Sequence, residues 1–264
     1  MAMKLEDVVA VIEEIANPDT QESWDNSGVQ LAAGPVEIHR VLTTLEITDA
    51  VIEEAEEEDV DLIVTHHPLI FGSLKSVDYR DMTGSYIVKL LNMGISVYSC
   101  HTPFDKLAGG NNDFLADLIG LKDTSGFSSG SDLDMIGRVG QLEEEMSLVS
   151  MLDLLSEKLE MDPEQFRAVG KPDSAIKTVG ICTGAGADLM DLAAANGCQL
   201  FITGDLKYHD AQKAKALGMA VIDAGHYGTE KSFAGNFADK LMGKTAGQIE
   251  VLESDVDIDP FEMI

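Results

Sequence analysis

The sequence lacks an apolar run long enough to cross a membrane, because no stretch approaches the roughly 18 uninterrupted apolar residues of a spanning helix. Its start also lacks the basic segment followed by an apolar core that marks a signal peptide. An amphipathic helix is expected there instead, with Leu5, Val8, Val9, Ile12 and Ile15 on one face. We therefore expect a cytoplasmic protein without a membrane-bound segment.

Cysteine is scarce, and the three cysteines form no C-x-x-C pair. This odd number argues against a disulfide framework or a zinc knuckle. Cys100, Cys182 and Cys198 all lie in or beside apolar runs, which favours small buried thiols. Cys100 precedes His101, so a nucleophilic role is the alternative, but no visible arrangement directs a base towards its thiol.

Basic residues are few: 18 Lys and Arg stand against 47 Asp and Glu, for a net charge of −29. Such a surface repels phosphate backbones, which argues against nucleic acid as a partner. The acidic residues are spread along the chain as well as clustered at 53–58 and 143–145, as in a solvated acidic coat. Adaptation to very high salt, as in the acidic proteome of a halophile, is our hypothesis for this charge.

Two blocks of the sequence alternate short apolar strands with helices, the pattern of parallel α/β units. The first block predicts strands at 41–47, 60–65 and 95–100 with helices at 49–58 and 84–93; the second predicts strands at 177–183, 198–203 and 219–224 with helices at 187–196 and 209–217. We therefore expect an α/β fold.

Between the blocks, residues 121–176 begin with the Gly/Ser/Asp-rich stretch KDTSGFSSGSD, whose composition predicts a loop or hinge. A strand at 135–142, a helix at 147–159 and a strand at 166–169 follow. We place one lobe at 1–125 with the C-terminal residues 225–264, and the other at 126–224.

The two blocks resemble each other beyond their order of elements. His66-His67 follows a strand as Gly204-Asp205 does, and His101-x-x-x-Asp105 follows the next strand as His226-x-x-x-Glu230 does. Gly94 and Gly218 mark the same turn before these strands. Two similar α/β lobes are indicated, with chance similarity between βαβ units as the alternative.

Five of the six histidines lie at or just beyond predicted strand ends: His66, His67, His101, His209 and His226. Ligands of parallel sheets bind outside the carboxyl ends of the strands, where loops converge. His39 precedes a strand and is expected on the surface.

Imidazoles and carboxylates together suit Zn, Mn, Fe, Co or Ni rather than Ca or Mg. Side chains alternate along a strand, so we expect His66 and His67 to point to opposite sides, one towards each of two metals. Asp105 and Glu230 are candidates to bridge two ions. The alternative is that both His-x-x-x-acid pairs lie in hydrogen-bonded loops, as Pro103 and Gly228 indicate.

Several motifs together resemble the Nif-three-like dinuclear metal-centre family, whose bacterial members are often named GTP cyclohydrolase 1 type 2 homologues. They are WDNSGVQL (24–31), THHPLIF (65–71), HTPFD (101–105), GGNND (109–113), IGRVGQL (136–142), TGAG (183–186) and GHYGTE (225–230). The resemblance covers most of the chain.

The resemblance implies a ligand set for two divalent ions: His66, His67, Asp105, His226 and Glu230. It also implies two similar α/β lobes facing a cleft that holds the metals, and a toroidal homohexamer. The short middle segment leaves no room for the third domain of ~100 residues that longer members insert.

Other residues are candidates for supporting roles. His101 has no metal bond in the family, so we expect a group behind the ligands or a catalytic acid or base, with a turn-stabilising role as the alternative. Asp25 and Asn26 are candidates to touch substrate from the cleft rim, although WDNSG is also a strong turn sequence.

A glycine-containing turn and one histidine each have a functional and a purely structural interpretation. Gly184 and Gly186 belong to a turn that would cradle an anionic substrate group, or would simply turn tightly. His209 lines the substrate cleft or serves only its helix start.

The function expected from these residues is metal-dependent hydrolysis, in which a metal-activated water attacks GTP, a phosphoester or an amide. The substrate would be a small molecule, possibly a nucleotide. A non-catalytic metal-handling or regulatory ring protein is the alternative. A third possibility, nucleic-acid binding inside the ring, is disfavoured by the negative net charge.

Overall fold

The computed structural model describes residues 2–34, 37–130 and 132–262, with the backbone alone for Asp132–Asp134. The chain divides into two compact units, each with its own sheet. Unit 1 comprises Met1–Phe104 and Ser232–Pro260, and unit 2 comprises Asp105–Lys231 with Phe261–Ile264.

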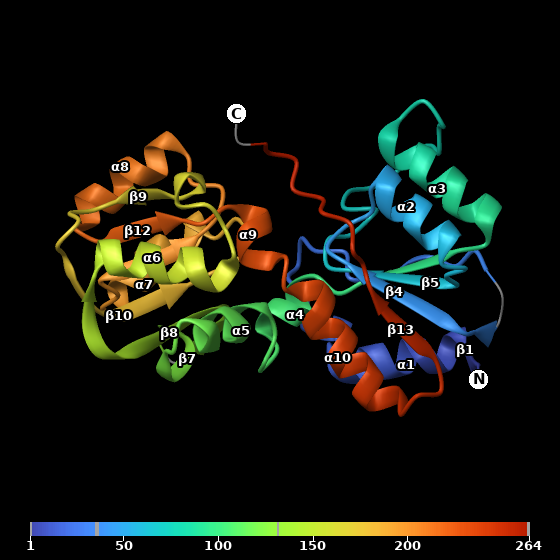
Figure 1. Cartoon of the computed structure of the whole chain (residues 1–264), viewed down its shortest axis with the longest axis horizontal. Helices are drawn as coiled ribbons and strands as arrows, with labels where there is room; N and C mark the ends of the chain where they lie inside the picture. Colours follow the sequence, from blue (N-terminus) through green and yellow to red (C-terminus); the bar gives the residue numbers. More distant parts are fainter. Residues whose placement is uncertain (1, 35–36, 131, 263–264) are drawn as a thin grey trace. The chain divides into compact units, whose positions relative to one another are not determined.

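The elements of unit 1 are labelled in Figure 1. They are β1 (Met3–Lys4), α1 (Leu5–Ile15), the 3-10 helix η1 (Pro18–Thr20), β2 (Gly28–Leu31), β3 (Glu37–Ile38), β4 (Arg40–Thr44), α2 (Asp49–Glu57), β5 (Leu62–Thr65), α3 (Met82–Met93), β6 (Ser96–Ser99), α10 (Phe233–Thr245) and β13 (Glu250–Glu253). α4 (Thr102–Lys106) begins in this unit and ends in the next.

The main sheet of unit 1 has the strand order β13-β4-β5-β6-β2. β13, β4, β5 and β6 run parallel, and β2 pairs antiparallel with β6. α2 and α3 cover one face of this sheet while α1 and α10 cover the other (Figure 1). The inner strands of a parallel sheet covered on both faces are shielded from water along their length, and every residue of β5 and β6 is buried.

Unit 2 continues the chain after α4. Its elements are α5 (Asn111–Leu118), β7 (Lys122–Ser129), β8 (Asp132–Ser147), α6 (Leu148–Leu159), η2 (Pro163–Gln165), β9 (Arg167–Val169), β10 (Ala175–Ile181), η3 (Ala187–Leu189), α7 (Met190–Ala195), β11 (Leu200–Thr203), α8 (Tyr208–Leu217), β12 (Ala220–Asp223) and α9 (His226–Glu230).

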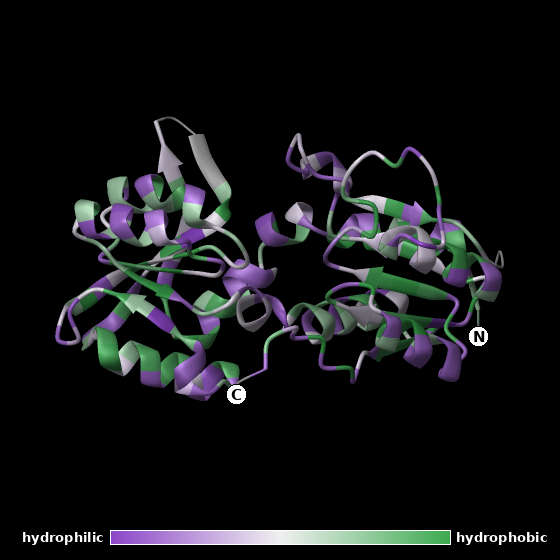
Figure 2. Cartoon of the chain, turned by 90° about the horizontal axis from the view of Figure 1, so that it is seen from above, coloured by the Kyte–Doolittle hydropathy of each residue, from purple (hydrophilic) through white to green (hydrophobic). Residues whose placement is uncertain are grey.

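The sheet of unit 2 has the order β7-β8-β10-β11-β12-β9, with β10, β11 and β12 parallel and the outer strands antiparallel. Side chains alternate across it, so Leu200 and Ile202 pack with α5 and α6 while Phe201 packs with α7 and α8. In both units the inner strands are mostly hydrophobic, while the helices carry both hydrophilic and hydrophobic residues (Figure 2).

Both blocks of α/β elements occur as predicted, and the mixed α/β fold is confirmed. In each, three parallel strands alternate with two helical segments, and an antiparallel strand, β2 or β9, pairs with the last of the three. Gly94 and Gly218 both end a helix in the left-handed region, with φ of 74° and 69°. At these positions a residue without Cβ avoids strain. That the two blocks form similar lobes stays a prediction.

One prediction about the middle segment was wrong. Residues 122–129 form the strand β7, which pairs with β8, instead of a loop or hinge. Glycine and serine suggested a flexible segment, but tertiary pairing overrides weak local propensity. The lobe boundaries that we placed at 125 and 225 both fall inside unit 2.

None of the helices in the described part of the chain has the length and apolar character that a bilayer crossing requires.

The three cysteines are free and buried, as expected. Burial raises the pKa of the Cys100 thiol well above its ordinary value, with smaller contributions from Glu13 and Asp25. Because the thiolate is the nucleophile, this shift disfavours the nucleophilic alternative for Cys100.

Candidate metal centre

In unit 1, three histidines gather where two neighbouring parallel strands end. His66 and His67 follow β5, and His101 follows β6. One ligand atom from each of the three lies within 4.8 Å of the others. The ring centroids of His66 and His67 are 5.1 Å apart, and His101 meets both rings nearly edge-on. The three imidazoles are sufficient donors for a transition-metal ion.

His66 is fully buried and firmly oriented. Its Nδ1 lies 2.9 Å from the carbonyl oxygen of Cys100, so Nδ1 carries the hydrogen and donates it. The ring also packs on Phe233 of α10, with centroids 5.0 Å apart. We expected His66 and His67 to point to opposite sides because side chains alternate along a strand. The strand β5 ends at Thr65, so this alternation does not apply to the two histidines.

His67 is the more exposed neighbour, with 21% of its side chain accessible. Its Nδ1 lies 3.4 Å from Oε2 of Glu46, a residue that follows β4. The backbone N–H groups of His66 and His67 both donate to the carbonyl of Leu45. These bonds hold the two histidines against the end of the neighbouring strand.

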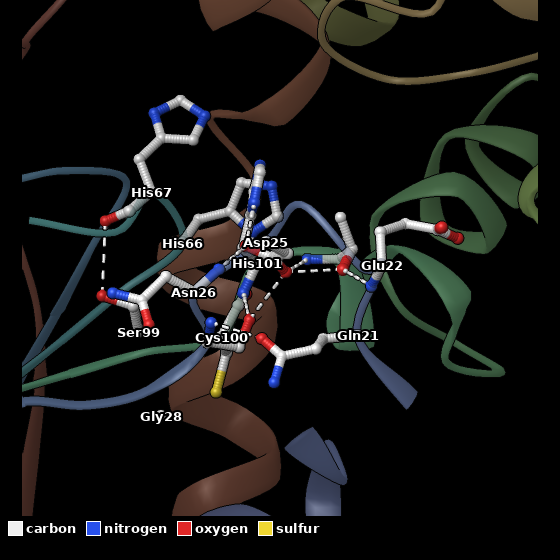
Figure 3. Close-up of polar contacts among 12 residues, drawn as sticks. Gln21, Glu22, Asp25, Asn26, Gly28, His66, His67, Ser99, Cys100 and His101 are labelled. Carbon is white, nitrogen blue, oxygen red and sulfur yellow. Dashed lines mark hydrogen bonds and ion pairs between the residues drawn. The ribbon is translucent and has the colours of Figure 1, made fainter. Parts of the chain in front are cut away.

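His101 is oriented by a carboxylate from the segment before β2 (Figure 3). Its Nδ1 donates to Oδ1 of Asp25 over 2.8 Å, and its backbone N–H donates to the Ser27 hydroxyl. The Asp25 side chain is fully shielded from solvent. Burial alone would raise the pKa of that carboxyl, but hydrogen bonds from His101 and Thr102 outweigh it and hold this pKa far below the ordinary range.

The second residue predicted at the substrate rim makes structural contacts. Asn26 donates from its side-chain amide to the carbonyl of Ile70 over 2.6 Å. Sequence reasoning proposed Asp25 and Asn26 as substrate-binding residues, and the structure adds that one orients His101 while the other holds the Ile70 loop. Substrate contact by either residue stays a prediction.

In unit 2, His226 and Glu230 lie one turn apart on α9. His226 Nε2 is 3.0 Å from Oε2 of Glu230, and the Glu230 carboxylate is buried. The opposite ring nitrogen, Nδ1, lies 2.8 Å from Oδ2 of Asp205. Both members of the pair thus belong to a short helix, not to the loop that Gly228 suggested.

Asp105 is the first residue of unit 2 and lies in α4, so the loop expected around Pro103 is also a short helix. Its carboxylate is buried, and Oδ1 accepts a hydrogen bond from the Asn111 side-chain amide over 3.1 Å. Asn112 donates to the Asp105 carbonyl and to that of Ile136. Both asparagines come from the GGNND motif.

The TGAG turn packs directly against the α9 pair. Gly184 has a φ of +63°, and a Cβ at this position would lie 2.2 Å from Oε1 of Glu230. Its N–H donates to the Thr229 hydroxyl. A Cβ on Gly186 would meet Cys182 and Thr203. Close packing therefore explains why both positions are glycine. An anion-binding role for the turn stays a prediction.

His209 makes no contact with these groups among the interactions that the structure records. It is exposed at the start of α8, and its ring meets Tyr208 with centroids 5.3 Å apart. The geometry favours local structure at the helix start over a place in the site. His39 is exposed, as predicted.

The sequence alone did not identify two carboxylates that orient histidines. Glu46 follows a strand end like the other site residues, and that position was its signal. Asp205 occupies the place of His67 in the second block. It holds a left-handed backbone with φ of 54°, a conformation that aspartate and asparagine adopt more often than most residues with a Cβ.

Comparison with known proteins identifies the family of this chain. A family model described as Duf34/NIF3 (NGG1p interacting factor 3) matches residues 3–260. The chain belongs to the Duf34/NIF3 family. The resemblance seen in the motifs is thereby confirmed.

Among curated relatives, a "GTP cyclohydrolase 1 type 2 homolog" from Clostridium perfringens is 33% identical over 99% of this chain and 100% of its own length. A "Protein NIF3 homolog" from Schizosaccharomyces pombe is 32% identical over 95% and 94%. The "GTP cyclohydrolase 1 type 2" of Helicobacter pylori is 34% identical over 87% and 88%.

Solved structures show the same fold over the full length of the Duf34/NIF3 chain. A Staphylococcus aureus hypothetical protein superposes with a TM-score of 0.91 at 28% identity, covering 99% of both chains. A Bacillus cereus protein related to NIF3 superposes with a TM-score of 0.90 at 21% identity, again covering 99% of both.

Proposed function

We propose that the chain binds two divalent metal ions and acts as a metal-dependent hydrolase. The proposed ligands are His66, His67, Asp105, His226 and Glu230. The family resemblance and the ligand chemistry support this ligand set. Zn, Fe, Mn, Co and Ni match this mixture of imidazole and carboxylate donors.

The observation that carries the proposal is shared by four imidazoles. The Nδ1 of His66 faces a carbonyl, and the Nδ1 atoms of His67, His101 and His226 face carboxylates. Metal-ligating histidines use one ring nitrogen for the metal and donate from the other to such an oxygen. The rings of His66, His67 and His226 are thus prepared to ligate through Nε2, and that of His101 is prepared to accept a proton there.

Divalent ions, when bound, would polarise an electrophilic centre and lower the pKa of water. The protein would contribute a proton acceptor through His101. Asp25 accepts the Nδ1 hydrogen of this residue, so Nε2 carries the lone pair in the neutral ring. His101 would accept a proton from water at Nε2 and then release it to the leaving group.

The names of the relatives support GTP as the first substrate to test. Phosphoesters and amides follow, because the same ligand set suits hydrolysis of either. A small molecule agrees with the acidic charge better than nucleic acid does.

The test measures metal content and turnover in one preparation. After saturation and removal of loose ions, we expect two metals per chain by elemental analysis, with metal-dependent product from GTP, a phosphoester or an amide. Asp105→Asn should lower the metal content and abolish product formation. Asp117→Asn, an exposed position on α5, is the matched control and should change neither quantity.

Two outcomes would contradict the proposal in different ways. Fewer than two metals per chain at saturation would exclude the dinuclear centre. Two tightly bound metals with no product from the whole panel would exclude the hydrolase and favour a metal-handling or regulatory binding protein.

We also propose a toroidal homohexamer, which the family resemblance supports. Sedimentation velocity over a range of protein concentrations tests it, and a monomer or dimer throughout would contradict it. The cytoplasmic location stays a prediction.

A further inference from the structure

Two large aromatic side chains in unit 1 are exposed beside the histidine group. Trp24 is 55% exposed and Phe71 is 56% exposed, and their ring centroids lie 6.1 Å apart. Large apolar rings gain free energy when they leave water, so a neighbouring pair left accessible indicates a binding surface. The chain has only one tryptophan, and aromatic residues make up 6% of it.

Both rings contact His101. The centroid of Trp24 lies 5.8 Å from the imidazole and that of Phe71 lies 6.1 Å from it, with interplanar angles of 73° and 75°. The imidazole therefore presents its edge or face to each ring at a steep angle. A flat group resting on the aromatic pair would lie next to the residue that we expect to transfer protons.

Hydrogen bonds hold the segments that carry the two rings. The Asn26 amide donates to the carbonyl of Ile70 over 2.6 Å, and the Ile70 N–H donates to Oε1 of Gln30 over 3.1 Å. These bonds join the segment after Trp24 to the residue before Phe71. Asp25, between Trp24 and Asn26, fixes His101. The surface is thus formed before a ligand arrives, which lowers the entropic cost of binding.

We propose that Trp24 and Phe71 form a platform for a planar heteroaromatic ring of the substrate. Such rings stack on indole and phenyl faces, whereas a sugar or a phosphate has no flat unsaturated face to offer. The proposal deepens the proposed function, on which the role of His101 rests, by naming the class of substrate.

A second copy of the chain is the competing occupant. Leu74, Val77 and Tyr79 are exposed beyond Phe71 in the same connection between β5 and α3. Among the ring contacts that the structure records, however, Tyr79 has none with His101 or with the pair. The contacts with His101 favour a substrate over a protein surface.

Intrinsic fluorescence tests the platform, because Trp24 is the only tryptophan. Guanosine and adenosine serve as ring-bearing probes, since they lack phosphates that would chelate a metal, and ribose serves as the probe without a planar ring. We expect saturable quenching by at least one nucleoside and none by ribose. The response should occur in chelator-treated and in metal-loaded protein.

Variants separate stacking from a general surface effect. Phe71→Ala should weaken nucleoside binding about tenfold, within the range measured for the loss of one stacking partner. Tyr79→Ala is the matched control, an exposed aromatic in the same loop, and should leave the dissociation constant unchanged. Trp24→Phe, followed by calorimetry, should retain binding, and Trp24→Ala should lose it.

Three results would overturn the platform: no saturable response to either nucleoside, an equal response to ribose, or unchanged binding in Phe71→Ala. Trp24 emission that changes with protein concentration and not with nucleoside concentration, together with a change in sedimentation coefficient, would assign the surface to a second copy of the chain. That result would also overturn the platform. Nucleoside binding with fewer than two metals per chain would leave the platform standing while the proposed function fails.

Discussion

The four oriented imidazoles differ in the oxygen that faces Nδ1. His66 faces the carbonyl of Cys100, whereas His101 and His226 face the carboxylates of Asp25 and Asp205. A carboxylate makes the opposite ring nitrogen more basic than a carbonyl does. We therefore expect His226 to be a stronger electron donor to a metal than His66. The His66 side chain, in turn, is better shielded from solvent than that of His226.

Gly184 offers a direct test of how Glu230 is positioned. In Gly184→Ala, the new Cβ would lie 2.2 Å from Oε1 of Glu230 and 3.2 Å from Nε2 of His226. The carboxylate must move, so we expect at least tenfold weaker Zn²⁺ binding by isothermal titration calorimetry, a loss typical of a disturbed metal environment. The left-handed backbone adds about 1–2 kcal/mol to the loss of stability.

Gly197→Ala is the matched control for this variant. Gly197 also has a positive φ, 76°, but its added Cβ would meet no atom within 4 Å. It should show the loss of stability without the loss of metal affinity. Equal affinity losses in both variants would mean that the contact with Glu230 is not responsible.

At the residue scale, the sequence was enough to propose the ligands but not the groups behind them. Strand ends place His66 and His101 at one sheet edge, because parallel strands β5 and β6 end together. Asp205 reaches His226 only through a left-handed turn. No hydrophobic period encodes such a turn, so sequence patterns do not predict this contact.

At the scale of elements, both α/β blocks were predicted, but α10 and several short elements were missed. α4 and α9 are helices of five residues each, too short for a 3.6-residue period to show. Pro103 suggested a loop, yet proline is tolerated in the first turn of a helix, where its missing N–H has no partner to lose. β7 was missed because its pairing with β8 is a tertiary contact.

Arg138 joins several elements of unit 2 through one buried side chain. It lies on β8, is 2% exposed, forms an ion pair with Asp113 of α5, and donates to the carbonyls of Lys106 and Leu107. Arg138→Met removes the guanidinium from beside the Asp113 carboxylate, which keeps the Gly109 N–H as a donor, and from the two carbonyls. We expect a loss of about 3–5 kcal/mol in the free energy of unfolding, measured by urea denaturation.

Arg80→Met is the control for Arg138→Met. Arg80 pairs with Asp78 while 75% of its side chain is exposed, and such pairs contribute little. We expect no measurable change in the urea midpoint. Comparable losses in both variants would contradict a special role for the buried arginine.

At the scale of the whole molecule, the net charge of −29 sets the response to salt. The screening length falls from about 10 Å at 0.1 M to about 3 Å at 1 M, which weakens repulsion between acidic side chains. We expect the urea midpoint to rise between 0.1 M and 2 M KCl. A midpoint that does not change, with full activity at low salt, would contradict adaptation to high salt.

A variant with fewer charges provides the internal comparison. Glu56 and Glu57 lie exposed in the acidic cluster of α2. Their joint replacement by glutamine should raise the urea midpoint at 0.1 M KCl. It should also reduce the increase in the urea midpoint between 0.1 M and 2 M KCl. A variant with the same salt response as the native chain would show that this cluster does not contribute.

Unit 1 is discontinuous, since it takes its last helix and an outer strand from residues after 231. β13 extends the sheet beside β4, and the Thr43 hydroxyl donates to the carbonyl of Ala234 on α10. A ribosome makes this chain from the N-terminus onwards. The half begun first must therefore wait until α10 and β13 have been translated, while the intervening half already has its sheet strands β7 to β12.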